Sequence, residues 1–375
     1  MKHSGGTAPR DRSQQTGQIL VLAVLGIVAM IAGVALLVEG GNSYAQQRRV
    51  QNAADSAANA GAGILAQRLG GIVMTDADVA SAIGVNAGLN SLTGNGAYYT
   101  DVTGQPLDAS GAVVAPADAA AVGGGTIPPN AQGVHDTGSR SFETSFGRVI
   151  GFTQFQATAN AVAVTGRLTG GQFLPVVFPV NITDCEQNGN LGAGEAEWSL
   201  SAPGEPPVGP EYIVPLCKTG GGSFMILDLD GTPNNCDEEV TNPPAIQFPD
   251  FPWLVPSDNG DNCANKMVDA VNALRGRVVL VPICDQACVT GGGSNAEYNI
   301  IKVAAFYLDY MSDSNNKNNS LCQTHVNAQG DLLTTIAGNG SSSCIAGWFV
   351  RYITTGPVGA GLIGNSDAIG VQLIK

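Results

Sequence analysis

Residues 17–69 read GQILVLAVLGIVAMIAGVALLVEGGNSYAQQRRVQNAADSAANAGAGILAQRL, and this stretch decides the fold. Its first part, Ile19 to Val38, is an unbroken apolar run without charge, amide or hydroxyl. A helix rises about 1.5 Å per residue, so roughly 20 apolar residues cross the hydrocarbon core of a bilayer. Because lipid offers no partner for free backbone N–H and C=O groups, the run must be helical there. The sequence therefore predicts one membrane-spanning helix.

Two other interpretations of the apolar run remain open. It could be the buried core helix of a soluble protein, although such runs are usually shorter. It could also be a cleaved secretory signal, and Ser43-Tyr44-Ala45 offers the small residues of a cleavage site. The apolar region of a signal is about 7–15 residues long, so the length favours a permanent anchor.

The polar boundary of the span is Glu39. This residue is either a lone functional carboxylate or the marker of the outer water boundary, and the second interpretation is favoured because ionisable groups normally stay at the interface. Gly40, Gly41 and Asn42 follow it and are expected to bend or loosen the helix at the level of the lipid headgroups.

From Tyr44 to Leu69 the pattern predicts an alanine-rich stem helix. A stripe of small apolar residues recurs at spacings of three and four, and its members are Val50, Ala53, Ala57, Ala60 and Ile64. The stripe could pack against other copies of the chain or against an assembly machine. It could instead pack on the chain's own globular part, and this is favoured because about two heptads do not make a sustained coiled coil.

The composition describes an acidic chain with little charge. It has 375 residues, a net charge of −14, 13% charged residues, 50 glycines and 20 prolines. The glycine and proline favour loops, turns and short strands. Binding to nucleic acid is disfavoured because phosphate contacts need clustered Lys and Arg. Beyond the anchor, no polybasic patch is present for anionic lipid.

Eight cysteines indicate the compartment of the C-terminal part. They are disulfide candidates: Cys185, Cys217, Cys236, Cys263, Cys284, Cys288, Cys322 and Cys344. An even number in a Gly-, Asn- and Ser-rich region favours disulfides formed outside the cytoplasm, with 105 pairings possible. Lys2, Arg10 and Arg12 before the span give a weak bias towards a cytoplasmic N-terminus. The larger C-terminal part is therefore expected on the extracytoplasmic side.

These observations predict an α+β fold: a long transmembrane and stem helix, then a β-rich, disulfide-stabilised extracytoplasmic region. The expected segments are a disordered cytoplasmic tail (1–16), the span and stem (17–69), a first exported α+β segment (70–170) and a Cys-rich, β-rich exported domain (171–375). Within 70–170 we expect a helix capped by Thr75, strands at 98–102 and 154–168, and a short helix at 141–150. Within 171–375 we expect strands at 223–229, 277–283, 298–308 and 347–355, and a helix at 264–275.

Few patterns suggest chemistry. Asp228, Asp230 and Gly231 resemble the start of a calcium loop, with Asp237, Glu238 and Glu239 beyond, but the glycine is the fourth residue of that loop, whereas an EF-hand has it at the sixth. A solvated acidic turn is favoured over a calcium site. A disulfide is favoured over zinc for Cys284 and Cys288, because no histidine pair is nearby. The sequence has no HExxH, GxSxG or Walker motif. No catalytic, cofactor-binding or metal-binding residues are therefore expected.

The stem also carries a resemblance. Gly17-Gln18 stands before the span, Glu39 stands after it, and Arg48 to Ala62 reads RRVQNAADSAANAGA. This resembles the N-terminal module of TadE/TadG-like proteins of Flp (tight adherence, Tad) pilus assembly, where an arginine-rich start and LQNAADAAALAGA are frequent. The chain departs from that pattern in having Glu39 where the family usually has Asp, and Asn59 within the alanines. Ala157-Thr158-Ala159 and Ala161-Val162-Ala163 resemble the strand ending of the family, which extends the resemblance to about residue 168.

The resemblance implies a structural or assembly component of a Tad (Flp) pilus or a related envelope system. It implies a single-pass protein of the bacterial inner membrane, with a cytoplasmic N-terminus and no enzymatic activity. The expected partners are the membrane, pilus-assembly or envelope proteins, and other copies of the chain through the stem; no cofactor and no nucleic acid are expected. The alternative is a membrane-anchored extracytoplasmic binding or adhesion module.

Overall fold

The computed structural model describes most of the chain. The described residues are 12–179, 207, 212–216, 225–233, 235–248, 251–258, 263–291, 296–312, 324–326, 332–334, 344–360 and 367–374. Residues 1–11 of the expected tail lie outside the described residues, as do Cys185, Cys217 and Cys322.

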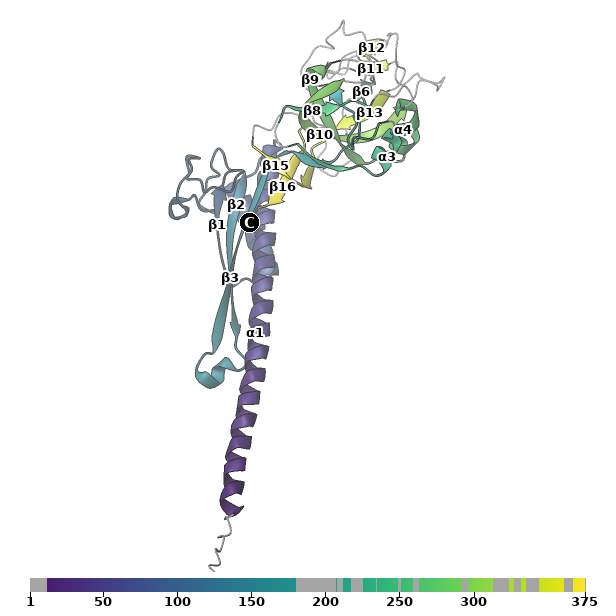
Figure 1. Cartoon of the computed structure of the whole chain (residues 1–375). Coiled ribbons are helices and arrows are strands. Elements are labelled where there is room, and N and C mark those ends of the chain that lie inside the picture. Colours follow the sequence, from purple (N-terminus) through teal and green to yellow (C-terminus); the bar gives the residue numbers. More distant parts are fainter. Residues whose placement is uncertain are drawn as a thin grey trace, which may run out of the picture.

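The molecule is organised along one helix, α1 (Arg12–Leu69), of 58 residues (Figure 1). It begins within the segment expected to be a disordered tail and runs on through Gly40, Gly41 and Asn42. The loosening expected there is therefore wrong: α1 continues as one α-helix from the apolar part into the stem. Along the apolar part the side chains are exposed, and none of its most apolar window is buried in protein. The helix is long and apolar enough to cross a membrane.

The first sheet lies beside the stem half of α1 (Figure 1). Its strand order is β1 (Gly94–Thr100), β2 (Gly133–Glu143), β3 (Gln154–Leu168), β16 (Ile369–Leu373) and β14 (Ile353–Thr355), and β15 (Val358–Gly359) also pairs with β3. All pairs are antiparallel except β14 with β16. The sheet therefore combines residues from before and after position 170, because the end of the chain returns to it.

Strand β3 shows why the helix and sheet pack. Ala157, Ala159 and Ala161 are buried and alternate with exposed residues, as in a strand with one covered face. From Ala161 onward, neighbours on both faces are buried. The small side chains of β3 pack against Val50 and the stem alanines in one apolar cluster.

Helix α2 (Asp76–Leu89) closes the other side of the stem. The expected cap is present: Thr75 Oγ1 accepts a hydrogen bond from Asp78 N, and Asp78 Oδ2 accepts one from Thr75 N. Two short 3₁₀ turns, η1 (Pro116–Asp118) and η2 (Gly147–Ile150), lie in the connections between strands.

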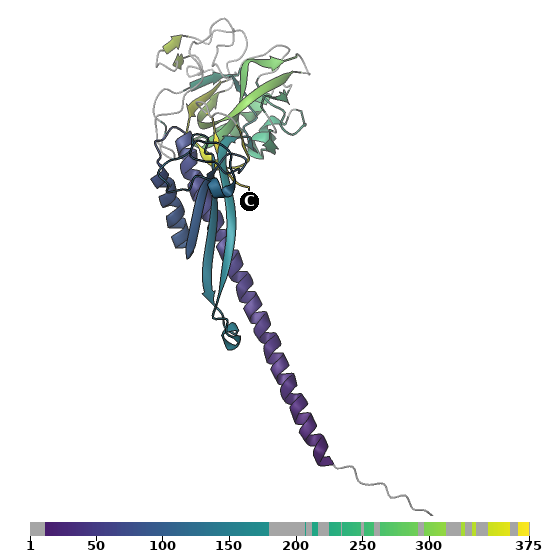
Figure 2. The same cartoon turned by 90° about the vertical axis from the view of Figure 1, so that its left-hand side faces the viewer.

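The second sheet builds the globular part beyond the C-terminal end of α1 (Figure 2). Its order is β5 (Phe178–Pro179), β9 (Val278–Thr290), β10 (Glu297–Ser312), β13 (Cys344–Phe349) and β6 (Tyr212–Pro215), with β8 (Trp253–Pro256) on β10. Helices α3 (Cys236–Thr241) and α4 (Cys263–Asn272) cover it. Smaller pairs are β4 (Gly170–Gln172) with β7 (Ala245–Gln247), and β11 (Thr324–Val326) with β12 (Leu332–Thr334).

Aromatic packing holds this part together. The Phe178 ring meets those of Phe306 and Phe349 edge to face, at centroid distances of 5.0 and 6.2 Å. Such pairs contribute beyond their buried area, by about 0.5–1.5 kcal/mol each. Met267 and Val271 of α4 add to the same core.

The predicted α+β class, with a long N-terminal helix before a β-rich disulfide-bearing region, is confirmed. Three predicted elements are wrong. Residues 141–150 are the end of β2 and a 3₁₀ turn, because β2 continues pairing with β3 as far as Glu143. Of the predicted strand 223–229 the structure describes residues 225–229, which make only isolated bridges next to Met225, whose φ is 62°. The 347–355 strand is interrupted between β13 and β14, because β13 belongs to the second sheet and β14 to the first.

Candidate functional site

The expected packing stripe lies against the protein itself. Val50, Ala53 and Ala57 are completely buried, and Ala60 and Ile64 are half-buried. The most buried face is turned slightly from the expected one, and its further members are Ala54, Ala58, Ala62, Leu65 and Ala66. Sequence reasoning missed them because it followed one row of small residues, whereas the sheet and α2 together cover two adjacent rows.

Close approach explains why this face is small. A Cβ added to Gly61 would lie 2.9 Å from Ile83 Cδ1 of α2 and 3.1 Å from Val134 Cγ2 of β2. Gly138 of β2 would place a Cβ 2.9 Å from Leu92. The stem, α2 and the sheet therefore meet at distances that exclude larger side chains.

Polar contacts fix the register of the stem against β3. Gln47 Nε2 donates to the carbonyl oxygen of Thr158 at 2.7 Å, and Gln51 Nε2 donates to that of Asn160 at 3.2 Å. A step of four residues on the helix therefore corresponds to two residues on the strand, and β3 runs in the same direction as α1. Its N-terminal end consequently points towards the apolar part of the helix.

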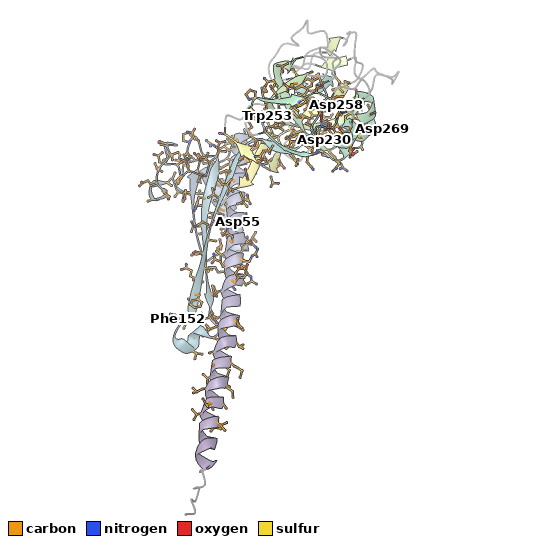
Figure 3. All side chains as sticks on the ribbon, viewed as in Figure 1. Asp55, Phe152, Asp230, Trp253, Asp258 and Asp269 are labelled. Atoms are coloured by element: carbon orange, nitrogen blue, oxygen red, sulfur yellow. A yellow bond between two sulfur atoms is a disulfide. The ribbon has the colours of Figure 1, made fainter. Side chains whose placement is uncertain are left out.

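The hairpin tip, which we define as residues 144–153 between β2 and β3, reaches Glu39 at the end of the span. Glu39 Oε2 accepts hydrogen bonds from the backbone N–H groups of Ser145 and Phe146, both at 3.0 Å. Figure 3 shows Phe152 at this lower end of the hairpin, beside α1. Sequence analysis missed the contact because it interpreted 141–150 as a helix. Glu39 therefore does more than mark a boundary, since it holds the hairpin tip.

Apolar side chains at and beside this tip are exposed. Val149 is 85% exposed and Phe152 58%, and Phe146 and the neighbouring Phe155 are also open to solvent. The only basic residue of the tip, Arg148, pairs with Glu143. A soluble surface rarely gathers several large apolar side chains in one short turn, so the tip is a candidate contact surface.

Three carboxylates converge in the part built on the second sheet. Oxygens of Asp228, Asp230 and Glu239 lie within 4.8 Å of one another. Glu239 is 1% exposed, although the sequence favoured a solvated turn here. Burial raises the pKa of Glu239 to about 7, and the charges of Asp230 and Asp228 add to that effect while two backbone N–H donors oppose it.

The cysteines in the described residues are bonded. Cys236 pairs with Cys263, Cys284 pairs with Cys288, and Cys344 is also disulfide-bonded. The Cys236 and Cys263 sulfurs lie near Asp258, a combination that could otherwise hold a metal. Because the disulfide uses both sulfurs, no thiolate is left there for zinc.

A cavity of about 400 Å³ lies between β4, β9 and residues 352–355. Its lining includes Phe173, Leu174, Val240, Leu280 and Tyr352, and no charged residue among those described. The described lining of the cavity therefore offers no carboxylate, imidazole or ammonium group for acid–base catalysis.

One buried acid stands apart from these clusters. Asp136 of β2 is completely buried, and this burial raises its pKa to about 7. The next residue back, His135, stacks on Tyr98 with ring centroids 4.4 Å apart.

The comparisons with known proteins concern the helix. A family model described as "Putative Flp pilus-assembly TadE/G-like" matches residues 17–66. None of the curated proteins and none of the solved structures matches the chain. The match confirms, for the span and most of the stem, the resemblance predicted from Arg48 to Ala62. Residues 17–66 are therefore similar to TadE/G-like pilus-assembly proteins, and in this chain they lie within one helix long and apolar enough to cross a membrane.

Proposed function

We propose that the chain is a non-catalytic structural component of a Tad (Flp) type pilus or a related envelope system. In this proposal it is anchored in the bacterial inner membrane, with the N-terminus in the cytoplasm and the sheets outside. The observation that carries the proposal is the match of residues 17–66 to the TadE/G-like family model, within a helix that passes without a break from the apolar part into the stem.

The continuous helix supports a mechanical role. Helical hydrogen bonds run through Gly40 to Asn42, and the stem is then packed on β2, β3 and α2. A displacement or rotation of the span would therefore be passed to the first sheet without a flexible joint. Such a rod is suited to holding an exported body at a fixed height and orientation beside an assembly machine.

The disulfides support the proposed orientation. The Cys236–Cys263 and Cys284–Cys288 bonds lie in the part built on the second sheet, at the end of the molecule away from the apolar helix (Figure 1). Disulfides persist in oxidising compartments and are rare in the cytoplasm. The sheets would accordingly lie outside the cytoplasmic membrane, which leaves the N-terminus inside.

Partners are proposed on the same basis. Pilus-assembly or envelope proteins would contact the exported sheets or the exposed face of the stem. Self-association through the stem would have to use its outer rows, because Val50, Ala53 and Ala57 are already covered by the chain's own sheet.

The test is a deletion of the gene in the native cell, complemented by the full chain or by a chain whose residues 19–38 are replaced with an unrelated apolar span. Filaments are counted by electron microscopy, and the position of the sheets is found by protease treatment of spheroplasts. Loss of filaments on deletion, with restoration by the full chain, is expected. Full-length protein that stays in the soluble fraction, or sheets protected inside spheroplasts, would overturn the proposal.

A second function, an anchored binding or adhesion module, is favoured by one observation. The disulfide-bearing part stands at the end of the helix farthest from the apolar run, where it could reach an external surface (Figure 1). The same deletion separates the two functions: normal filaments with lost attachment would support adhesion in place of assembly.

A further inference from the structure

We propose that Asp228, Asp230 and Glu239 bind a divalent cation of the calcium type. The three residues lie between the bridge at Leu227 and the first turns of α3, and Figure 3 shows Asp230 in the part built on the second sheet. Oxygens of all three carboxylates lie within 4.8 Å of one another. A single cation could therefore contact all of them after small side-chain adjustments.

Glu239 carries the argument. One of its oxygens, Oε1, accepts hydrogen bonds from the backbone N–H groups of Leu229 at 2.7 Å and Asp230 at 3.0 Å. The other, Oε2, is enclosed and accepts no hydrogen bond from the described residues. A buried carboxylate oxygen without a partner, beside two further acids, is costly. A cation would supply the missing partner and remove the repulsion.

The neighbouring groups are oriented for such a role. Asp228 Oδ1 accepts from Gly231 N at 2.7 Å, and Asp230 Oδ2 accepts from Asn235 Nδ2 at 2.9 Å. Asn235 Oδ1 is itself enclosed and accepts no hydrogen bond from the described residues. Among the residues that the structure describes, the cluster therefore presents carboxylate and amide oxygens, which are ligands that calcium prefers.

The spacing agrees with this geometry. Asp228, Asp230 and Glu239 are the first, third and twelfth residues of a loop, positions that hold calcium in an EF-hand. The sequence argument against a site was the glycine at the fourth position. Gly231 has φ of 80°, so the sharp turn that an EF-hand makes at its sixth residue is made here two residues earlier. The turn is shifted by two residues, but Glu239 at the twelfth position still lies close to Asp228 and Asp230 at the first and third.

The chemistry of the donors favours calcium over zinc. Zinc sites are built mainly from nitrogen and sulfur ligands, and the nearest sulfurs, Cys236 and Cys263, are joined to each other. Magnesium demands a tighter octahedral arrangement and retains several waters, whereas calcium accepts irregular sets of oxygens.

The experiment is an isothermal titration of the full chain in detergent micelles, freed of metal with EDTA and dialysed, with CaCl₂ and in parallel with MgCl₂. A saturable heat corresponding to one calcium per chain is expected, with weaker binding of magnesium. Calcium should also raise the midpoint of thermal unfolding, because a ligand that binds the folded state stabilises it.

The variants are chosen to preserve the fold. Glu239→Gln keeps an oxygen for the two backbone donors and removes the charge, and Asp230→Asn changes an exposed member; each should weaken calcium binding at least about tenfold, since both remove a charged ligand. Asp237→Asn is the matched control, because it removes the same charge from the same helix outside the cluster. Absence of a saturable heat in the parent chain, or equal binding by Glu239→Gln and Asp237→Asn, would overturn the proposal.

A second inference comes from the hairpin tip and rests on the proposed membrane anchoring. We infer that the tip lies in the headgroup region of the same membrane that α1 crosses. Glu39, which binds Ser145 and Phe146 through their backbone N–H groups, is the residue immediately after the apolar run. The tip is therefore held at the level where the span leaves the lipid.

The side chains of the tip match that position. Val149 and Phe152 are largely exposed, and Phe146 is partly exposed, so apolar surface faces outward where the hydrocarbon begins. Phe and other large apolar side chains enter the boundary between lipid headgroups and acyl chains, and the one cation of the tip, Arg148, is neutralised by its pair with Glu143. The occupant of this surface is thus a bilayer that is continuous with the one around α1.

The test uses the full chain reconstituted into vesicles that contain phosphatidylglycerol and lipids brominated near the headgroup end of the acyl chains. Val149→Trp places a fluorophore at the tip. Val73→Trp is the matched control, since Val73 is 91% exposed but lies beyond the other end of the stem. About 30 helical residues separate Glu39, which holds the tip, from the end of α1 near Val73, and this corresponds to about 45 Å along the helix axis.

Quenching by the brominated lipid, after subtraction of the parent signal, is expected for Val149→Trp and not for Val73→Trp. Equal quenching of the two variants in chains that float with the vesicles would overturn the tip inference and leave the anchoring intact. Failure of the parent chain to float with the vesicles would overturn the anchoring itself.

Discussion

Lys302 Nζ lies 3.5 Å from Asp367 Oδ1, and both side chains are almost completely buried where the two sheets meet. Lys302 belongs to β10 of the second sheet. Asp367 precedes β16 of the first sheet, and its Oδ2 lies 3.6 Å from Arg167 Nε on β3. A backbone hydrogen bond joins the same two segments, since Ala368 N donates to the Val303 carbonyl oxygen at 2.8 Å. The Asp367 carboxylate therefore pairs with one cation from each sheet, Arg167 of the first and Lys302 of the second.

Asp367→Ala should therefore destabilise the chain strongly. Removing one partner of a buried ion pair leaves an uncompensated charge, at a cost of about 3–5 kcal/mol. The measurement is the free energy of unfolding by denaturant of the full chain in micelles. Asp309→Ala is the control, since Asp309 pairs with Arg275 at 2.9 Å on the surface, where a pair contributes about 0–1 kcal/mol. Equal small losses for both variants would show that the junction does not depend on Asp367.

Asp136 gives a prediction about pH. Burial raises its pKa from the ordinary 3.8 to about 7, so the folded state holds a proton that the unfolded state has lost over this interval. The free energy of unfolding should therefore fall as the pH rises from about 4 to 7, and then no longer change through this group. Asp136→Asn removes the carboxyl group and should be less sensitive over that interval. The measurement is thermal unfolding of parent and variant at several pH values; parallel profiles would contradict the assignment.

Ala57 gives a prediction about packing. It is completely buried among Leu65, Val79, Ile83 and Val134, so Ala57→Leu adds volume where α1, α2 and the sheet already touch. Such overpacking costs about 1–3 kcal/mol. Asn52→Leu, at an exposed position of the same stem, is the control and should change stability little. If Ala57→Leu unfolds at the same denaturant concentration as the parent chain, the stem does not pack on the sheet in this way.

Much of the local structure could be predicted because its signals are local. The strand predicted at 154–168 has the same bounds as β3, and the Thr75 cap is present, since alternation and capping depend on adjacent residues. Strands β9 and β10 were predicted in part and are longer at one or both ends. The TadE/G-like segment was recognised for the same reason, because its motif is continuous in the sequence.

The rest depends on contacts between distant residues. Residues 141–150 have apolar spacing that suits a helix, but pairing with β3 and the hydrogen bonds from Ser145 and Phe146 to Glu39 decide their structure. The pairing of β16 with β3 joins positions about 200 residues apart, and no local sequence pattern predicts it. The burial of Glu239 likewise follows from the placement of α3, so the sequence could show the acids without showing that they converge.

The disulfides allow the last prediction. Cys236 and Cys263 are 27 residues apart, whereas Cys284 and Cys288 are 4 apart, and all four are buried. In the chain-entropy description a cross-link stabilises mainly by restricting the unfolded state, which gives about 3.5 kcal/mol for the long loop and about 2 kcal/mol for the short one.

The double variant Cys236→Ala/Cys263→Ala should thus lose more free energy of unfolding than Cys284→Ala/Cys288→Ala. Because the side chains removed are alike and similarly buried, lost packing largely cancels between the two variants. EDTA is kept in both samples so that a cation at Asp228, Asp230 and Glu239, next to Cys236, does not contribute. If the short loop proves the more stabilising of the two, native packing around Cys284 outweighs the entropy of the unfolded chain, and the second sheet owes its stability to local geometry at the end of β9.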